Sequence, residues 1–129
     1  MSASLLAVVV DCRDPRPQAD FWSQVLSCGV LERNTDEFLV GDPDARATPL
    51  YFMRVPEPKV GRNRLHVDVV ADGSLEDEVA RLTGLGASLV EFRQDPPTLD
   101  NPDTWAVLED PEGNVFCVIS PATANTGWV

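Results

Sequence analysis

Two stretches of the chain, about 60 residues apart, carry the same succession of apolar, turn and helix signals. Four pairs of segments correspond in order: 6–14 with 64–72, 25–30 with 82–87, 39–44 with 107–112, and 51–56 with 115–120. Because the repeat occurs only twice and spans most of the chain, it indicates an internal duplication and not a solenoid. The sequence therefore predicts two modules of one fold.

Each copy predicts the order strand, helix, strand, strand, strand. Asp14-Pro15 and Ser74-x-x-Asp77 are typical helix starts, with a capping side chain followed by proline or by an acidic third residue. Module 1 is expected over about 5–56 and module 2 over about 63–120, within a single domain of 1–129. The expected strands are 5–11, 30–33, 37–40 and 50–55, then 64–71, 88–93, 105–109 and 115–119; the helices are 15–28 and 75–85, and 94–104 and the tail 121–129 are expected to be irregular.

Charge and cysteine content exclude several classes of protein. The formal net charge of −11 argues against nucleic acid and anionic membranes as partners, since phosphate groups attract clustered Lys and Arg. No apolar run approaches a membrane span, and residues 1–10 lack the basic start of a signal peptide. The three cysteines are odd in number and widely spaced, which favours reduced thiols and a cytoplasmic location.

Residues 64–71 contain the only histidine of the chain. Successive side chains of a strand alternate between its faces, so His66 and Asp68 share one face with Val70. Leu65, Val67 and Val69, together with Phe116 and Val118 of the last strand, are expected to pack under the helices. The His66 face is left for a pocket.

Three local sequences carry a family resemblance: 54–59 (RVPEPK), 62–69 (RNRLHVDV), and 105–117, where W-x-V-L-x-D-P-E-G-N precedes Phe116 and Cys117. With the duplicated order of elements, the chain resembles the vicinal oxygen chelate superfamily, of the glyoxalase and bleomycin-resistance type. This resemblance implies an α+β fold of two tandem βαβββ modules, forming a curved mixed sheet with a concave cavity and helices on the outer face. It also implies a homodimer, and Trp128 is a candidate for contacting the partner.

The resemblance also implies where a metal would bind. In metal-using members the ligands come from the first and last strands of each module, which here correspond to Val8, Met53, His66 and Cys117. Only His66 is a familiar ligand, and Cys117 stands where a glutamate is expected. A catalytic zinc site usually has three protein ligands and one open position. We therefore expect no catalytic metal, with His66 and Cys117 as the remaining weak candidates for a divalent ion.

Alternate residues in phase with His66 describe an apolar pocket with a few polar groups, which is typical of a small-molecule site. The candidate ligand-binding residues are His66, Asp68, Val8, Tyr51, Met53, Trp105 and Cys117. Purely structural roles stay open: a partly buried histidine, an Asp68–arginine pair, and a Cys117 that only fills the core.

Three functions follow from these residues. The first is metal-independent binding of an apolar or aromatic small molecule. The alternative is a metal-dependent isomerase, lyase or ring-cleaving dioxygenase that uses His66 as its candidate catalytic residue. The third, a purely structural dimer module, is disfavoured by polar residues facing the pocket.

Overall fold

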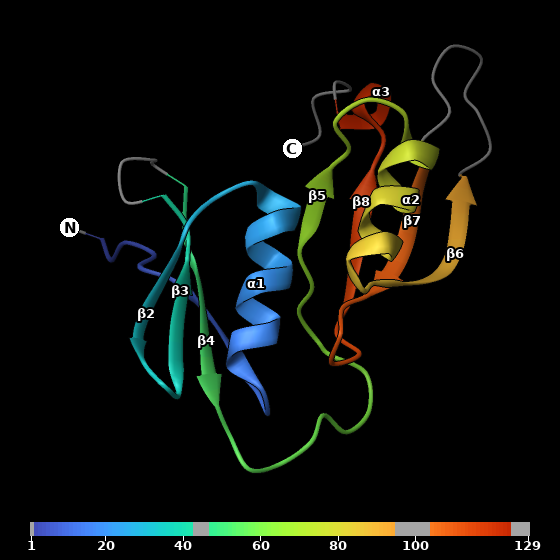
Figure 1. Ribbon diagram of the computed structural model, residues 1–129. Helices are drawn as coiled ribbons and strands as arrows, with labels where there is room; N and C mark the ends of the chain where they lie inside the picture. Colours follow the sequence, from blue (N-terminus) through green and yellow to red (C-terminus); the bar gives the residue numbers. More distant parts are fainter. Residues whose placement is uncertain (1, 43–46, 95–103, 125–129) are drawn as a thin grey trace. The chain divides into compact units, whose positions relative to one another are not determined.

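The computed structural model describes residues 2–42, 47–94 and 104–124. The chain divides into two compact units, Met1–Val60 and Gly61–Val129 (Figure 1). Each unit contains one of the two expected modules, so we call them module 1 and module 2. Trp128 and most of the expected loop 94–104 lie outside the described residues.

Both modules have the order βαβββ. Module 1 consists of β1 (Val8–Cys12), α1 (Pro15–Leu26), β2 (Val30–Asn34), β3 (Glu37–Val40) and β4 (Leu50–Arg54). Module 2 consists of β5 (Asp68–Val70), α2 (Leu75–Leu85), β6 (Ser88–Gln94), β7 (Thr104–Glu109) and β8 (Val115–Ile119), followed by the short helix α3 (Pro121–Ala124). The α+β fold predicted from the sequence, two tandem βαβββ modules, is confirmed.

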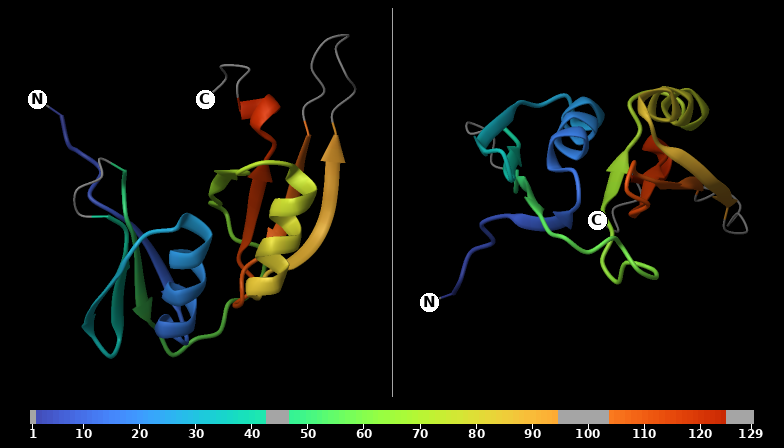
Figure 2. Two further views of the ribbon diagram at one scale, coloured as in Figure 1. Left: turned by 45° about the horizontal axis from the view of Figure 1, so that its top comes forward. Right: turned by 60° about the horizontal axis from the view of Figure 1, so that its bottom comes forward.

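Each module has its own four-stranded mixed sheet, with strand orders β1-β4-β3-β2 and β5-β8-β7-β6 (Figure 2). The first strand runs parallel to the last strand of its module, and the other neighbours are antiparallel. One helix packs on each sheet. Among the described residues, none of the helices is both long and apolar enough to cross a membrane.

The helix signals act in different ways in the two modules. The Ser74 hydroxyl accepts a hydrogen bond from the Asp77 amide at 3.1 Å, which confirms the predicted cap of α2. Asp14 is the N-cap residue of α1, but its side chain makes no capping hydrogen bond. Proline in the first turn of α1 supplies the start signal there, because its fixed φ already suits a helix.

The module 2 core lies between α2 and the facing side of the sheet. Leu82 of α2 and Leu108, Phe116 and Val118 of the sheet are each at most 1% exposed. Phe116 and Val118 thus lie under the helix, as predicted from strand alternation. The opposite face of the sheet, which carries Cys117, is therefore the side available for a site.

Several expected boundaries are wrong. Regular pairing of β5 with β8 covers only Asp68–Val70, so His66 lies in the extended segment just before the strand. Leu65 was expected to pack under a helix but is 86% exposed, because it precedes the paired part of the chain. Residues 121–124 form a helix instead of a loose tail.

The first strand is also shorter than expected. It was predicted over 5–11 but begins at Val8, opposite Leu50, where its partner β4 begins. Leu5 and Leu6 precede this pairing and are 73% and 86% exposed.

Candidate functional site

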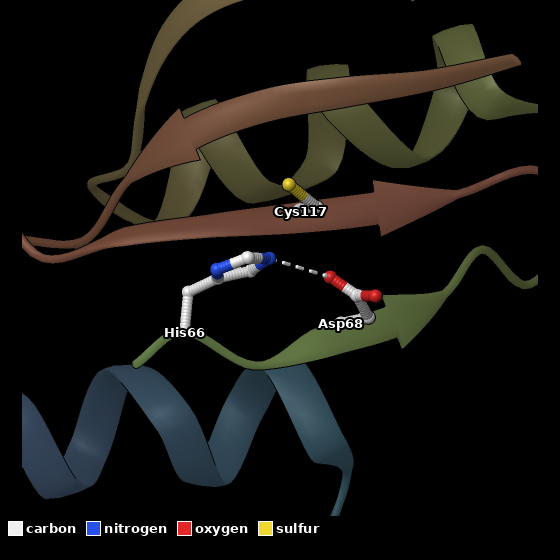
Figure 3. Close-up of side chains that lie close together, drawn as sticks. All are labelled: His66, Asp68 and Cys117. Atoms are coloured by element: carbon white, nitrogen blue, oxygen red, sulfur yellow. Dashed lines mark ion pairs between the residues drawn. The ribbon is translucent and has the colours of Figure 1, made fainter. Parts of the chain in front are cut away.

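Module 2 brings the side chains of His66, Asp68 and Cys117 together (Figure 3). His66 Nε2 lies 3.3 Å from Asp68 Oδ1. One ligand-type atom from each residue, including Cys117 Sγ, lies within 4.8 Å of the other two. An imidazole, a carboxylate and a thiol therefore converge from residues 66–68 and from a strand about 50 positions later in the sequence.

Strand pairing explains why these three residues meet. Asp68 is the direct parallel partner of Cys117, so their side chains point to the same face of the sheet. His66 is two residues before Asp68 and shares that face. The Cys117 amide donates to the Val67 carbonyl at 3.0 Å, which holds the His66 segment against β8 although it is not part of the regular strand.

Asn63 extends this attachment beyond the strand. Its side-chain Oδ1 accepts a hydrogen bond from the Val115 amide at 2.9 Å, and its Nδ2 donates to the Val115 carbonyl at 3.2 Å. Nδ2 also donates to the Leu65 carbonyl at 2.5 Å. The Asn63 amide thus imitates a backbone strand partner and fixes the chain immediately before His66.

The electrostatic environment keeps the Cys117 thiol protonated. Burial is the main cause that raises the pKa of Cys117 above its ordinary value of 9.0, and the charge of Asp68 adds to it. Arg93 and Arg62 act in the opposite direction but do not compensate. Because the thiolate is the reactive form of cysteine, these surroundings disfavour Cys117 as a nucleophile at neutral pH.

The rest of this face is mainly apolar. Val107 of β7 is the direct partner of Cys117, and Trp105 is the partner of Ile119. Val107 and Trp105 are partly exposed, and Val70 is 57% exposed. The register therefore places Trp105, a predicted ligand-binding residue, on the same face as Cys117.

In module 1, the expected role of Val8 is wrong. Val8 pairs with Leu50, and so it shares its face with the buried Phe52 and not with Tyr51 and Met53. The sequence alignment placed 6–14 opposite 64–72, so that both stretches end on an aspartate, Asp14 and Asp72. The connection from strand to helix is longer in module 2, and this shifted the alignment of β1 by one residue. A shift of one residue exchanges the two faces of a strand.

The corrected register identifies Asp11 as a residue that the sequence reasoning missed. Asp11 pairs with Met53 as Asp68 pairs with Cys117, and it is exposed. The sequence alignment already placed Met53 opposite Cys117, but which residues of β1 and β5 pair with these two positions became visible only in the structure. Tyr51, the other predicted residue of this face, donates to Glu37 Oε2 at 2.5 Å and accepts from Arg33 at 3.2 Å.

The donor set of module 2 fits a divalent metal ion better than the sequence suggested. We expected no catalytic metal because only four positions were considered, those that correspond to the ligands of metal-using family members. Two of these four residues, Val8 and Met53, are unsuitable ligands. Asp68 was predicted to bind the organic ligand or to pair with an arginine and was not counted as a metal ligand, yet it lies beside His66 and opposite Cys117. Nitrogen, oxygen and sulfur ligands from three residues match the number that a catalytic zinc site requires.

Comparison with known proteins agrees with the observed fold. A glyoxalase/bleomycin resistance protein/dioxygenase family enzyme from Burkholderia phytofirmans PsJN has a similar structure, with a TM-score of 0.71 and 22% identity over 92% of this chain and 98% of that one. A FosX variant from Listeria monocytogenes, complexed with Mn(II) and 1S,2S-dihydroxypropylphosphonic acid, gives 0.70 and 12% over 92% and 90%. The oxidase ChaP-H2 gives 0.59 and 18% over 93% and 94%.

A search among curated proteins found no match. The family model of the glyoxalase-like domain, however, matches residues 7–119, which include both modules and all three residues of the candidate site. The chain therefore belongs to the glyoxalase-like domain family.

Proposed function

We propose that this protein binds a small organic molecule with an apolar or aromatic part on the face of the module 2 sheet that carries Cys117. The observation that carries the proposal is the contact between His66 and Asp68, at 3.3 Å, beside a largely apolar surface. Their side chains are 45% and 38% exposed, so both can reach a bound molecule. Sites of this kind combine an apolar lining with few polar groups that fix orientation.

The chemistry of the face defines the class of ligand. Trp105 and Val107 offer apolar contact, and His66 and Asp68 offer a hydrogen-bond donor and acceptors next to it. A molecule with an aromatic or aliphatic body and a hydroxyl, carbonyl or carboxylate at one end would use both parts.

The test is a thermal-shift and calorimetric screen of chelator-treated protein with phenols, aromatic carboxylates and aliphatic carboxylates. A ligand of this face raises the unfolding temperature of wild type and binds at least tenfold more weakly to His66→Ala and Asp68→Asn. Asp11→Asn, the equivalent change in module 1, is the matched control and keeps wild-type affinity. Equal affinity for wild type and His66→Ala, or no binding by any compound class, would overturn the proposal.

A second candidate is a metal-dependent isomerase, lyase or ring-cleaving dioxygenase. The specific observation in its favour is the convergence of three metal-ligand side chains within 4.8 Å. A divalent ion supplies Lewis acidity that polarises an oxygen of a bound molecule. Repeating the same screen with added Zn(II), Mn(II) or Fe(II) separates the candidates, because only the second requires the ion for ligand turnover.

We also propose that the protein forms a homodimer, since closed two-fold pairs are the commonest assemblies of soluble chains. Exposed apolar side chains such as Leu5 and Leu6 give such an assembly surface to cover. Light scattering at micromolar concentration tests this proposal, and a monomer mass would contradict it.

A further inference from the structure

The donor atoms of module 2 are already close to the spacing of a tetrahedral metal centre. Zinc binds nitrogen, oxygen and sulfur at about 2.0–2.3 Å, which sets neighbouring ligand atoms roughly 3.3–3.8 Å apart in a tetrahedron. His66 Nε2 and Asp68 Oδ1 are separated by 3.3 Å, and Cys117 Sγ completes a group whose separations do not exceed 4.8 Å. The largest separation thus exceeds the tetrahedral range by about 1 Å at most.

The identity of the donors selects the metal. Thiolate ligands favour zinc and other borderline or soft ions, whereas manganese, magnesium and calcium prefer oxygen ligands. On binding an ion, the Cys117 thiol would release its proton to solvent, and the resulting thiolate, one carboxylate and a neutral imidazole would balance the charge of a divalent ion. We propose that His66, Asp68 and Cys117 bind one zinc-class divalent ion entirely within module 2, with one coordination position left open.

The two strands hold this donor set in place before an ion arrives. Asp68 and Cys117 are direct strand partners, and the Cys117 amide is bonded to Val67, between the other two donors. Preorganised ligands lose little conformational freedom on binding. The site is also accessible, because Cys117 forms its floor at 9% exposure while His66 and Asp68 remain partly exposed at its edge.

Arg93 is one of two nearby cations that act on Cys117, so its charge opposes a bound metal. Its Nε lies 2.6 Å from Glu91 Oε1, however, and this ion pair offsets the positive charge. The local field is therefore compatible with a divalent ion next to two anionic ligands.

Module 1 provides an internal comparison. The positions that correspond by strand register are Val9, Asp11 and Met53, which contain a single strong ligand. Among the described residues, His66, Asp68 and Cys117 are the group of metal-binding type that lies close together. The proposal therefore predicts one ion per chain. It does not depend on the organic ligand proposed above.

Cobalt(II) is the probe, because it replaces zinc in such sites and its bond to a thiolate gives a charge-transfer band in the near ultraviolet. Full-length protein is stripped with a chelator, dialysed and titrated with Co(II) under reducing conditions. We expect one equivalent to bind with a thiolate charge-transfer band. Zn(II) should displace it, while an equal concentration of Mn(II) should leave it bound.

Variants assign the ligands. Cys117→Ser should abolish the charge-transfer band, and His66→Ala and Asp68→Asn should each weaken cobalt binding at least tenfold. Cys28→Ser and Asp11→Asn change the same residue types in module 1 and should leave both band and affinity unchanged. Circular dichroism verifies the folding of every variant. If His66→Ala or Cys117→Ser fails to fold, Asp68→Asn, which keeps the shape of the side chain, still tests the site.

The outcomes separate cleanly. A band that survives in Cys117→Ser, unchanged affinity in Asp68→Asn, equal affinity for Mn(II), or no stoichiometric binding at micromolar protein would each overturn the proposal. The binding of organic compounds is measured on chelator-treated protein, so it does not depend on the metal site. The two proposals can therefore fail separately.

Discussion

The side-chain amide of Asn63 pairs with the backbone of Val115 through two hydrogen bonds, of 2.9 Å and 3.2 Å. These residues are 52 positions apart in the sequence, and the contact sits between the linker and the first residue of β8. Regular pairing of β5 begins only at Asp68. The Asn63 amide and the Val67 carbonyl therefore fix the two ends of the segment that contains His66.

Removal of the Asn63 side-chain amide should destabilise the segment that contains His66. Asn63→Ala leaves the Val115 N–H and C=O without their side-chain partner, and we expect a loss of about 1–3 kcal/mol in the free energy of unfolding. Asn63→Asp keeps the acceptor for the Val115 amide but turns a carboxylate oxygen toward the Leu65 and Val115 carbonyls, so it should not restore the lost stability. Urea unfolding measures both variants, and cobalt affinity should fall in both. Arg64→Ala, an exposed neighbouring change, should stay within about 0.5 kcal/mol of wild type; an equal loss in Arg64→Ala would contradict this role of Asn63.

The two faces of the module 2 sheet should respond differently to truncation. Val118 is fully buried under α2, whereas Val70 is 57% exposed on the opposite face. Val118→Ala should cost roughly 1–3 kcal/mol, from lost burial and the cavity left behind. Val70→Ala removes the same two methyl groups and should change stability by no more than about 0.5 kcal/mol. Urea midpoints compare them, and the reverse order would show that the faces are assigned wrongly.

The parts of this structure that follow from local periodicity were predictable from the sequence. Alternation in β8 correctly assigned Phe116 and Val118 to the helix side, and the duplication revealed the βαβββ order. The face of Val8 was not predictable, because connections of unequal length conceal which residues of two strands correspond. Asn63 was missed for a different reason: a side chain that bonds to a backbone 52 residues away leaves no local pattern.

The sequence analysis also counted too few candidate metal ligands at the site. His66 stood out as the only histidine, but Asp68 became a third metal-ligand candidate only when strand pairing placed it opposite Cys117. A count restricted to the positions of the family's metal ligands omits Asp68, which lies on the same face as His66 and Cys117.

The cap of α2 should contribute measurably to stability. Ser74 accepts the Asp77 amide at 3.1 Å, so Ser74→Ala leaves an amide of the first turn without its side-chain acceptor. We expect a loss of about 1 kcal/mol, within the usual range of 0.5–2. Ser74→Asp restores an acceptor and should recover most of this loss in the same urea experiment. A Ser74→Asp variant as unstable as Ser74→Ala would show that the cap bond is not the cause.

Glu78 should make the stability of the protein sensitive to acid. Its side chain is buried, and burial by itself raises the pKa of the Glu78 carboxyl. The hydrogen bond from the Asp72 amide, at 2.9 Å, and the Arg81 guanidinium, at 2.5 Å, outweigh burial and leave the pKa below its ordinary value of 4.5. The ionised carboxylate is therefore the form that the fold prefers.

Because the pKa of Glu78 is lower in the folded chain, its stabilising effect is complete above the ordinary carboxyl pKa and is lost as pH falls through the folded value. Glu78→Gln cannot ionise, so it should be less stable than wild type at pH 7, and the difference should shrink progressively below pH 4.5. Urea unfolding at a series of pH values measures this difference. Glu76→Gln, an exposed change on the same helix, is the control that removes one carboxylate of the same type. A Glu78→Gln difference that stays constant down to the lowest pH would contradict the assignment, since the ionised carboxylate would then add nothing to the folded state.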